Sequence, residues 1–385
     1  MAISRLSALL HIFLLLYQAV YFANAYQIHC ARRHWNSLLQ SSAASTEVQS
    51  HSPKLLQATL APYEGPISRR ETDKRILKHF NAEFPFFFPG QGSQYVGMGV
   101  ATANEIPAAK ELYSKASSIL GYDLLSVCEK GPKAVLDATD VAQPAIFVCS
   151  MAAVEKLRAT KGNEEAMKAT VSLGLSLGEY SALCYADAIS FEDAVLITKE
   201  RGAAMQAASD NVRSSMVAVL GLTADKVKDL CDRSAEISSE PIQIANFLCK
   251  GNYVVSGSTA ACEALERIAK PQFKALKTIR LPVAGAFHTA FMESAVPRLH
   301  KVLDGITVHK PRIPIISNVD AEAHTDPARI RELLVEQVTS PVLWENSVKS
   351  VLENGFNEGY ELGPGTTLSG ILKRLDSTKY LLSIV

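Results

Sequence analysis

A serine flanked by glycines carries the strongest chemical signal in this sequence. Gly174-Leu175-Ser176-Leu177-Gly178 has the form G-x-S-x-G, follows the apolar run Ala169 to Leu173 and precedes residues of helical character. In that context the motif predicts a nucleophile elbow, a sharp turn that lifts the serine hydroxyl out of a sheet. The alternative is an ordinary strand–turn–helix corner, because the pattern also occurs by chance. The flanking pattern favours covalent catalysis through Ser176.

A serine hydroxyl is a weak nucleophile and needs a general base, so the histidines are the next residues of interest. After residue 70 the chain has five: His79, His288, His300, His309 and His324. His79, His309 and His324 have charged or polar neighbours, which is typical of exposed positions. His288 lies among small and apolar residues, in Gly285-Ala286-Phe287-His288-Thr289. A histidine in such surroundings is usually a satisfied core residue, but because Ser176 needs a partner we predict that His288 is the base.

Arg201 lies on the apolar face of a predicted helix. Ser190 is the expected N-cap, with Asp193 three residues later. One face then carries Ala194, Ile197, Ala204 and Ala208, with Met205 one turn beyond the arginine. A guanidinium on such a face is costly unless an anion pairs with it, and its fork matches a carboxylate. Two partners remain open, a carboxylate of the protein itself and a carboxylate of the substrate.

A glycine-rich loop, Pro89-Gly90-Gln91-Gly92-Ser93-Gln94, follows the apolar run Phe84 to Phe88. It does not have the form G-x-G-x-x-G, since residue 95 is tyrosine, and no G-K-[ST] follows, so a phosphate cradle is not indicated. A loop that crosses the sheet near the elbow could instead supply an N–H group to an oxyanion. The alternative is a simple glycine-rich turn.

The elements that must position these residues belong to the α/β class. Phe84 to Phe88 and Ala169 to Leu173 are short apolar runs that end at glycine or proline, as buried strands do. Helical character is found around Ala108 to Leu120, Ser190 to Ser209 and Pro327 to Val338. Strands that alternate with helices favour a parallel sheet covered on both faces.

The segment 212–283 has a different order of elements. Strands are expected at Met216 to Leu222, Ile242 to Phe247, Tyr253 to Ser256 and Thr278 to Val283, with helices starting at Thr223 and Thr259. This is the β-α-β-β-α-β order of the ferredoxin-like unit. We therefore expect a small ferredoxin-like subdomain at 212–283, inserted into a larger subdomain made of 71–211 and 284–385.

The N-terminus has the composition of a two-part leader. Arg5, the apolar run Leu6 to Phe22 and the ending Ala23-Asn24-Ala25 predict a signal peptide over 1–25; a membrane anchor is the alternative. Residues 26–70 are basic, serine-rich and acid-poor, as in an organelle transit peptide. The combination resembles leaders of proteins sent to plastids with extra bounding membranes. A mitochondrial protein and a secreted protein with a linker are the alternatives.

Composition excludes several classes of protein. The 39 basic side chains balance the 39 acidic ones, which argues against nucleic-acid binding by bulk charge. Residues 1–70 carry a net charge of +4, which leaves −4 for residues 71–385, so an acidic partner would have to meet a local basic patch. The seven cysteines form no C-x-x-C pair, and neither a disulfide scaffold nor a metal site is indicated. We expect no membrane segment after the leader.

Several spaced motifs together resemble one family. FFFPGQGSQ, DVAQPAIF, GLSLGEYSAL, the Arg201 helix, GAFHTAFM and ELGPGTTLSG occur in this order between Phe84 and Val385. The set is similar to the malonyl-CoA:acyl carrier protein transacylases of type II fatty acid synthesis. The resemblance implies an α/β-hydrolase-like part with a ferredoxin-like insert. It also implies transfer of malonyl from malonyl-CoA to an acyl carrier protein. We expect no cofactor and a monomer.

The resemblance also implies roles for single residues. Ser176 would be the acylated nucleophile, His288 its base, and the backbone N–H groups of Gln91 and Leu177 the oxyanion hole. Arg201 would bind the malonyl carboxylate, and the main-chain carbonyl of Gln337 would orient the histidine. The acyl pocket would be lined by Gln143, Met205, Asn246 and Phe287, the last resembling the signature of malonyl-selective acyltransferases. The chain departs from the family at Leu175, usually histidine, and at Leu248, usually asparagine, which bears on acyl selectivity.

Two other functions are open on the sequence alone. An esterase or thioesterase uses a similar elbow, and an acidic residue after Ser176 that completes a triad would favour it, but none is identifiable. A non-enzymatic module that keeps the fold is the second, against which the presence of Ser176, His288 and Arg201 argues.

Overall fold

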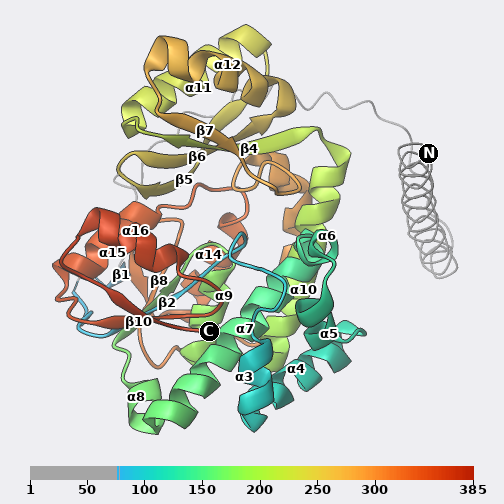
Figure 1. Ribbon diagram of the computed structural model, residues 1–385, viewed down its shortest axis with the longest axis vertical. Coiled ribbons are helices and arrows are strands. Elements are labelled where there is room, and N and C mark those ends of the chain that lie inside the picture. Colours follow the sequence, from blue (N-terminus) through green and yellow to red (C-terminus); the bar gives the residue numbers. More distant parts are fainter. Residues whose placement is uncertain (1–75, 78) are drawn as a thin grey trace, which may run out of the picture. The chain divides into compact units, whose positions relative to one another are not determined.

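A seven-stranded sheet forms the centre of the larger part of the chain in the computed structural model, which describes residues 76–77 and 79–385 (Figure 1). The predicted leader, 1–25 and 26–70, lies outside the described residues. The strand order is β1 (Ile76–Leu77), β9 (Ala323–His324), β8 (Ile315–Ile316), β3 (Val171–Gly174), β2 (Pro85–Phe88), β10 (Gly359–Leu362) and β11 (Leu381–Ile384).

Five neighbouring strands, in the spatial order β8, β3, β2, β10 and β11, are parallel to one another, as the sequence predicts. The sheet is nevertheless mixed, because β9 runs antiparallel to both of its neighbours, β8 and β1. Only a short turn, residues 317–322, joins β8 to β9, and such a short connection allows antiparallel pairing alone. The alternation of strands and helices in the sequence does not predict this antiparallel edge of the sheet, which β9 and β1 form.

Side chains of β2 point alternately to the two faces of the sheet, and both faces are covered. Phe86 and Phe88 pack with α7 (Thr139–Lys161), α9 (Gly178–Tyr185) and α10 (Phe191–Asn211). Phe87 lies in a second core with α15 (Trp344–Glu353) and α16 (Thr367–Leu375). The prediction of a sheet buried on both sides is therefore confirmed.

The remaining helices extend the layer around α7 and α10 or connect strands. They are α3 (Val100–Glu105), α4 (Pro107–Leu120), α5 (Leu124–Lys130), α6 (Lys133–Leu136), α8 (Asn163–Met167), η1 (Ala290–Ala295), α13 (Val296–Asp304) and α14 (Pro327–Glu336). The three helices predicted from the sequence correspond to α4, α10 and α14. The Ser190 side chain caps α10 as expected, accepting a hydrogen bond from the Asp193 backbone N–H at 3.0 Å.

A second, antiparallel sheet has the predicted β-α-β-β-α-β order. Its elements are β4 (Ser214–Leu220), α11 (Ala224–Ser238), β5 (Ile242–Cys249), β6 (Asn252–Ser258), α12 (Thr259–Phe273) and β7 (Lys277–Arg280). The strands pair in the order β5-β6-β4-β7, and α11 and α12 cover one face (Figure 1). The ferredoxin-like unit is thus present, with strand ends within three residues of most predicted limits.

Both faces of β4 in this small sheet are buried, and by different neighbours, whereas the edge strand β7 is largely exposed. Val217 and Val219 pack beneath α11 and α12, whereas Met216 and Ala218 belong to the same core as Phe86. In addition, β5 pairs with Val342, whose N–H donates to the Ala245 carbonyl at 2.8 Å. The small sheet is therefore joined to the larger part of the chain by a shared core and by the hydrogen bonds at Val342.

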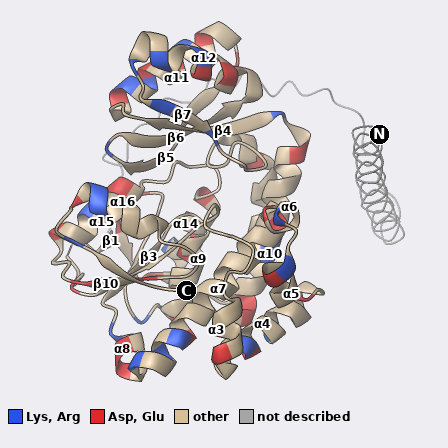
Figure 2. Ribbon diagram, viewed as in Figure 1, with Lys and Arg blue, Asp and Glu red and all other residues tan. Residues whose placement is uncertain are grey.

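Charged side chains of both signs are interspersed on α11 and α12 (Figure 2). Several form exposed pairs within one helix, such as Lys228–Asp232 and Arg233–Glu236. All six cysteines in the described part of the chain are free thiols. Over residues 76–77 and 79–385, no helix has the length and apolar character needed to cross a membrane.

Candidate active site

Ser176 lies at the turn between β3 and α9, and its backbone has φ = +53°, in the left-handed region. The backbone of a non-glycine residue is strained in this region, and such strain is typical of functional turns. The glycines on either side permit the turn, because there is no room for larger residues. A Cβ on Gly174 would lie 1.9 Å from the Gly178 carbonyl carbon, and one on Gly178 would lie 2.1 Å from the Phe88 oxygen. The predicted elbow is therefore present, and its sequence motif has a steric cause.

His288 faces the serine hydroxyl. Its Nε2 lies 2.9 Å from Ser176 Oγ, and its Nδ1 lies 2.9 Å from the main-chain oxygen of Gln337. A carbonyl can only accept, so Nδ1 carries the hydrogen and Nε2 presents a lone pair to the serine. Burial, and secondly the charge of Arg201, lower the pKa of His288 to about 4. The imidazole is accordingly neutral near pH 7 and able to accept a proton.

Arg201 is 1% exposed and reaches the same serine from α10. Its guanidinium donates to Ser176 Oγ at 3.1 Å, to Gln143 Oε1 at 2.8 Å and to Gln337 Oε1 at 2.8 Å. No carboxylate of the described chain forms an ion pair with it, and its Nε has no hydrogen-bond partner there. The sequence left two partners open for Arg201, a carboxylate of the protein and a carboxylate of the substrate. Within the described chain, no protein carboxylate pairs directly with Arg201.

The loop Pro89 to Gln94 packs directly on the elbow. A Cβ on Gly90 would lie 2.1 Å from the Leu175 carbonyl oxygen, and the Leu175 N–H donates to Phe88 at 3.0 Å. In the part of the chain that the structure describes, the backbone N–H groups of Gln91 and Leu177 have no hydrogen-bond acceptor. Leu177 also precedes the first turn of α9, where backbone N–H groups point out of the helix. Two free donors are available beside Ser176.

Other residues singled out from the sequence lie at different distances from this centre. The Gln143 amide donates to Met205 Sδ at 3.4 Å, which places both beside Arg201. Phe287 is buried directly before His288. Asn246 is buried on β5, but within the described residues its side chain makes no hydrogen bond to the others.

Two residues that the sequence analysis does not single out support the elbow. The Asn318 side chain accepts from the Ser176 N–H at 2.5 Å and donates to the Gly174 carbonyl at 2.7 Å. Glu179 Oε2 accepts from the Asn318 N–H at 2.9 Å and from Gln337 Nε2 at 2.8 Å. Glu179 belongs to the motif GLSLGEYSAL, which is a signal that was available, whereas nothing in the sequence around Asn318 indicates its role.

His324 corrects one expectation from the sequence. It is 1% exposed, on β9, with its Nε2 at 3.1 Å from both carboxylate oxygens of Asp320. The prediction of an exposed position was wrong because polar sequence neighbours do not reveal that β9 lies between two other strands. His79, His300 and His309 are exposed.

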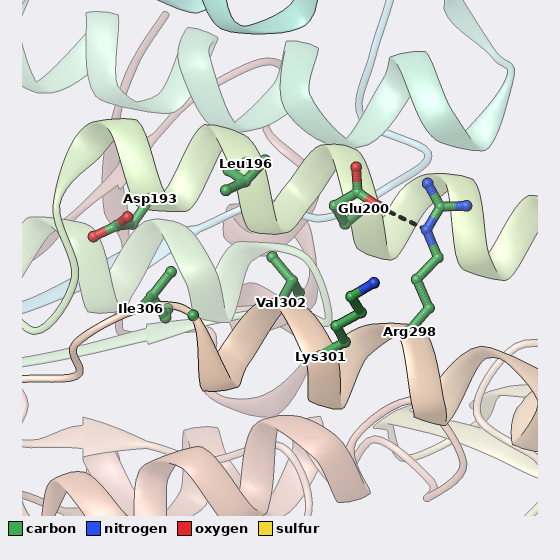
Figure 3. A pocket seen from close by; sticks show the side chains of 8 residues that line it. Asp193, Leu196, Glu200, Arg298, Lys301, Val302 and Ile306 are labelled. Carbon is green, nitrogen blue, oxygen red and sulfur yellow. Dashed lines mark hydrogen bonds and ion pairs between the residues drawn. The ribbon is translucent and has the colours of Figure 1, made fainter. Parts of the chain in front are cut away.

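A cavity of about 520 Å³ lies elsewhere, between α10 and α13 (Figure 3). Glu200 and Arg298 form an ion pair at its edge, with 2.7 Å between their closest atoms. Its α10 residues are Asp193, Leu196 and Glu200, which lie on a different face of the helix from Arg201. No residue of the Ser176 site lines this cavity.

Comparison with known proteins identifies the family. The model of the acyl transferase domain matches residues 85–378. The mitochondrial malonyl-CoA-acyl carrier protein transacylase of Mus musculus is 41% identical over 297 residues, covering 74% of this chain and 77% of the relative. The corresponding transacylase of Bacillus subtilis is 38% identical over 295 residues, covering 77% and 91%. The chain belongs to the malonyl-CoA:acyl carrier protein transacylase family.

A solved structure supports this membership at the level of the fold. It is a type II PKS acyl-carrier protein in complex with its malonyl-transacylase, and it matches with a TM-score of 0.74 and 33% identity. The match covers 78% of this chain and 96% of that one. The resemblance drawn from the motifs and the predicted fold class are both confirmed. The match to the acyl transferase domain begins at residue 85, after the residues of the predicted leader.

Proposed function

We propose that this chain transfers a malonyl group from malonyl-CoA to the phosphopantetheine thiol of an acyl carrier protein, for fatty acid synthesis, through a malonyl-serine at Ser176. One observation carries the assignment of residues. Ser176 Oγ lies 2.9 Å from a neutral imidazole nitrogen and 3.1 Å from a buried guanidinium nitrogen. A nucleophile, a base and a cation therefore meet at one oxygen, which suits an acyl group that itself carries a carboxylate.

In the first half-reaction the Ser176 oxygen attacks the thioester carbonyl, and His288 Nε2 takes the hydroxyl proton. The negative charge on the carbonyl oxygen is bound by the N–H groups of Gln91 and Leu177, each such donor contributing about 3 kcal/mol in comparable enzymes. The tetrahedral intermediate collapses, the carbon–sulfur bond breaks, and the coenzyme A sulfur leaves with the proton from His288. The product is a malonyl ester on Ser176.

In the second half-reaction the carrier's thiol replaces coenzyme A. His288 takes the thiol proton, the sulfur attacks the ester carbonyl, and the same two N–H groups bind the oxyanion. When the carbon–oxygen bond breaks, His288 returns the proton to Ser176. The Gln337 carbonyl holds Nδ1–H throughout, so Nε2 remains the nitrogen that exchanges protons.

The acyl group is held by its free carboxylate. We assign Arg201 to this carboxylate, because its guanidinium already reaches Ser176 Oγ, the atom that would carry the acyl group. Gln143, Met205, Asn246 and Phe287 are assigned to the acyl pocket. Leu175 and Leu248 replace polar residues that are usual in the family, and we infer that they alter fine acyl selectivity and leave the reaction class intact.

Intact-protein mass after mixing residues 71–385 with malonyl-CoA tests this function. We expect a malonyl adduct that is absent in Ser176→Ala and that disappears when carrier protein is added. Arg201→Ala should lower malonyl adduct formation sharply while sparing or improving the acetyl adduct from acetyl-CoA, because only malonyl needs the cation.

Other outcomes would identify the alternatives. Steady release of coenzyme A without an adduct would indicate a thioesterase, although His288 is oriented by a backbone carbonyl and not by a carboxylate. Neither adduct nor release would indicate a non-enzymatic module. A malonyl preference that survives Arg201→Ala would remove Arg201 from the carboxylate site.

Localisation, domain limits and assembly are further parts of the proposal. We assign the leader 1–70 to plastid import across extra membranes, with a mitochondrion as the alternative suggested by the name of the mouse relative. Fusion of residues 1–70 to a fluorescent protein would decide between them. We place the small subdomain at 212–283 and expect residues 71–385 to be a monomer, which light scattering would test.

A further inference from the structure

Glu179 is a buried carboxylate without a cation at hydrogen-bond distance. It lies in the first turn of α9 and is 3% exposed. Its recorded donors are both neutral, the Asn318 backbone N–H and the Gln337 side-chain amide. Charged groups are almost never buried in this way unless another charge compensates them. A positive charge that compensates Glu179 is therefore expected nearby, beyond its direct hydrogen-bond partners.

Arg201 is a buried positive charge that likewise has no oppositely charged group at hydrogen-bond distance among the described residues. It is buried, and its three acceptors, Gln143, Gln337 and Ser176, are all neutral. Gln337 is the residue common to both charges. Its Nε2 lies 2.8 Å from Glu179 Oε2, and its Oε1 lies 2.8 Å from the Arg201 guanidinium.

The two charges fix the direction of the Gln337 amide. A carboxylate only accepts and a guanidinium only donates, so the NH₂ end must face Glu179 and the oxygen end must face Arg201. The amide dipole is then aligned between a negative and a positive group, and a single side chain couples them in a site of low dielectric constant.

We propose that Glu179 supplies the negative charge that compensates Arg201, and that the Gln337 side chain couples the two. The acyl carboxylate then competes with Glu179 for the positive charge of Arg201. The proposal rests on the assignment of Arg201 to the acyl carboxylate. Glu179 does not touch the reacting atoms, and its role is that of a positioning residue. A second carboxylate at Arg201 is repelled by Glu179, so Glu179 weakens malonyl binding and favours exchange of the acyl group over a tight resting complex.

Protonation of Glu179 should change malonyl binding in the unmodified protein as the pH changes. Burial raises its pKa to about 7. Among the described residues, the charged or titratable groups that face this cluster are Arg201 on α10, Tyr180 on α9, His288 before η1, Asp320 in the β8–β9 turn and His324 on β9. His288 remains neutral above about pH 5, since its pKa is about 4. As pH falls through 7, Glu179 gains a proton, repulsion is lost, and malonyl should bind more tightly.

Binding of malonyl-CoA and acetyl-CoA to non-reacting Ser176→Ala protein, measured by titration calorimetry, tests the proposal. Adding Glu179→Gln, which keeps the shape and removes the charge, should lower the Kd of malonyl-CoA about fivefold and leave that of acetyl-CoA within about twofold. Acetyl-CoA is the matched control because it has every charge of malonyl-CoA except the acyl carboxylate. Equal weakening for both ligands would show a merely structural role, and no change for malonyl-CoA would show that the charge does not reach Arg201.

Two further arms keep the test decisive. If Glu179→Gln does not fold, the Ser176→Ala protein is titrated between pH 6 and 8, where the malonyl-to-acetyl affinity ratio should rise on acidification; a flat ratio would overturn the proposal. In an Arg201→Ala background, Glu179→Gln should no longer change that ratio. A malonyl preference retained in Arg201→Ala alone refutes the assignment of Arg201, whereas loss of preference with no effect of Glu179→Gln refutes only the counter-charge.

Discussion

Three groups determine the reactivity of the Ser176 oxygen: the imidazole that accepts its proton, the guanidinium that donates to it, and the strained backbone that carries it. Arg201 and His288 are close enough for the cation to oppose protonation of the base. A cation beside a general base normally weakens it, but in the proposed function the same cation holds the acyl carboxylate. The site therefore works with a histidine of unusually low basicity.

The pH dependence of serine acylation follows from this pair. As the proposed base, His288 would act in its neutral form. Because its pKa is lowered to about 4, activity should be retained above that pKa and lost below it. The single-turnover rate of coenzyme A release from saturating acetyl-CoA should stay within about twofold from pH 8 to pH 5 and halve near pH 4. In Arg201→Ala the fall should move to higher pH, because one of the two causes of the low pKa is removed. A decline centred near pH 6.5 in the unmodified protein would contradict the inferred environment of His288.

At the scale of single elements, the glycines of the elbow are the most constrained positions. Gly178 lies where β2, the loop after it and α9 meet, and a Cβ there would lie 2.1 Å from Phe88 O and 2.9 Å from Pro89 O. Both of those atoms are backbone, so they cannot move aside as a flexible side chain could.

Gly178→Ala should therefore destabilise the protein by about 3 kcal/mol or more and abolish malonylation of Ser176. Gly370→Ala is the matched control, because Gly370 is exposed within α16 and an added Cβ would meet no atom within 4 Å. The control should raise stability by about 0.5 to 1 kcal/mol through helix propensity. Urea unfolding measures both effects, and equal stabilities of the two variants would show that the elbow is less tightly packed than described.

At the scale of the whole molecule, the small sheet shares its core with the large part of the chain. Met216 and Ala218 face that shared core, and alternate residues of the same strand face α11 and α12. His288 comes after β7 in the chain, and the neighbouring Ala286 N–H donates to Ser214 on β4 at 3.0 Å. The insert therefore helps to place His288, and its packing should be energetically coupled to the candidate active site.

Met216→Ala should lower the free energy of unfolding by about 2 to 5 kcal/mol through the cavity that it leaves. The loss should be seen equally by far-ultraviolet circular dichroism and by the fluorescence of Trp344, which is the only tryptophan in residues 71–385 and lies in the core around Phe87. Coincident transitions would show cooperative unfolding of both sheets. If the Trp344 transition did not move while the ellipticity transition did, the small sheet would be an independent folding unit.

The sequence by itself determined the α/β class, two central strands of the large sheet, the element order of the small sheet and the elbow. It also singled out Ser176, His288 and Arg201, which the fold brings together at one oxygen. Each of these depends on neighbours in the chain: periodicity defines strands and helices, the two glycines permit the turn, and an arginine on an apolar stripe requires an anion. The family motifs added Gln337 as the residue that orients the histidine, through its main-chain oxygen, but gave no role to its side chain.

Only the tertiary structure decided how those residues are held. The Asn318 side chain reaches the Ser176 backbone across 142 positions, and Gln337 reaches Glu179 across 158. The antiparallel edge strand β9 and the burial of His324 depend equally on distant partners. No local pattern encodes such pairs, because the burial and hydrogen bonding that give a polar side chain its role exist only after distant segments have packed together.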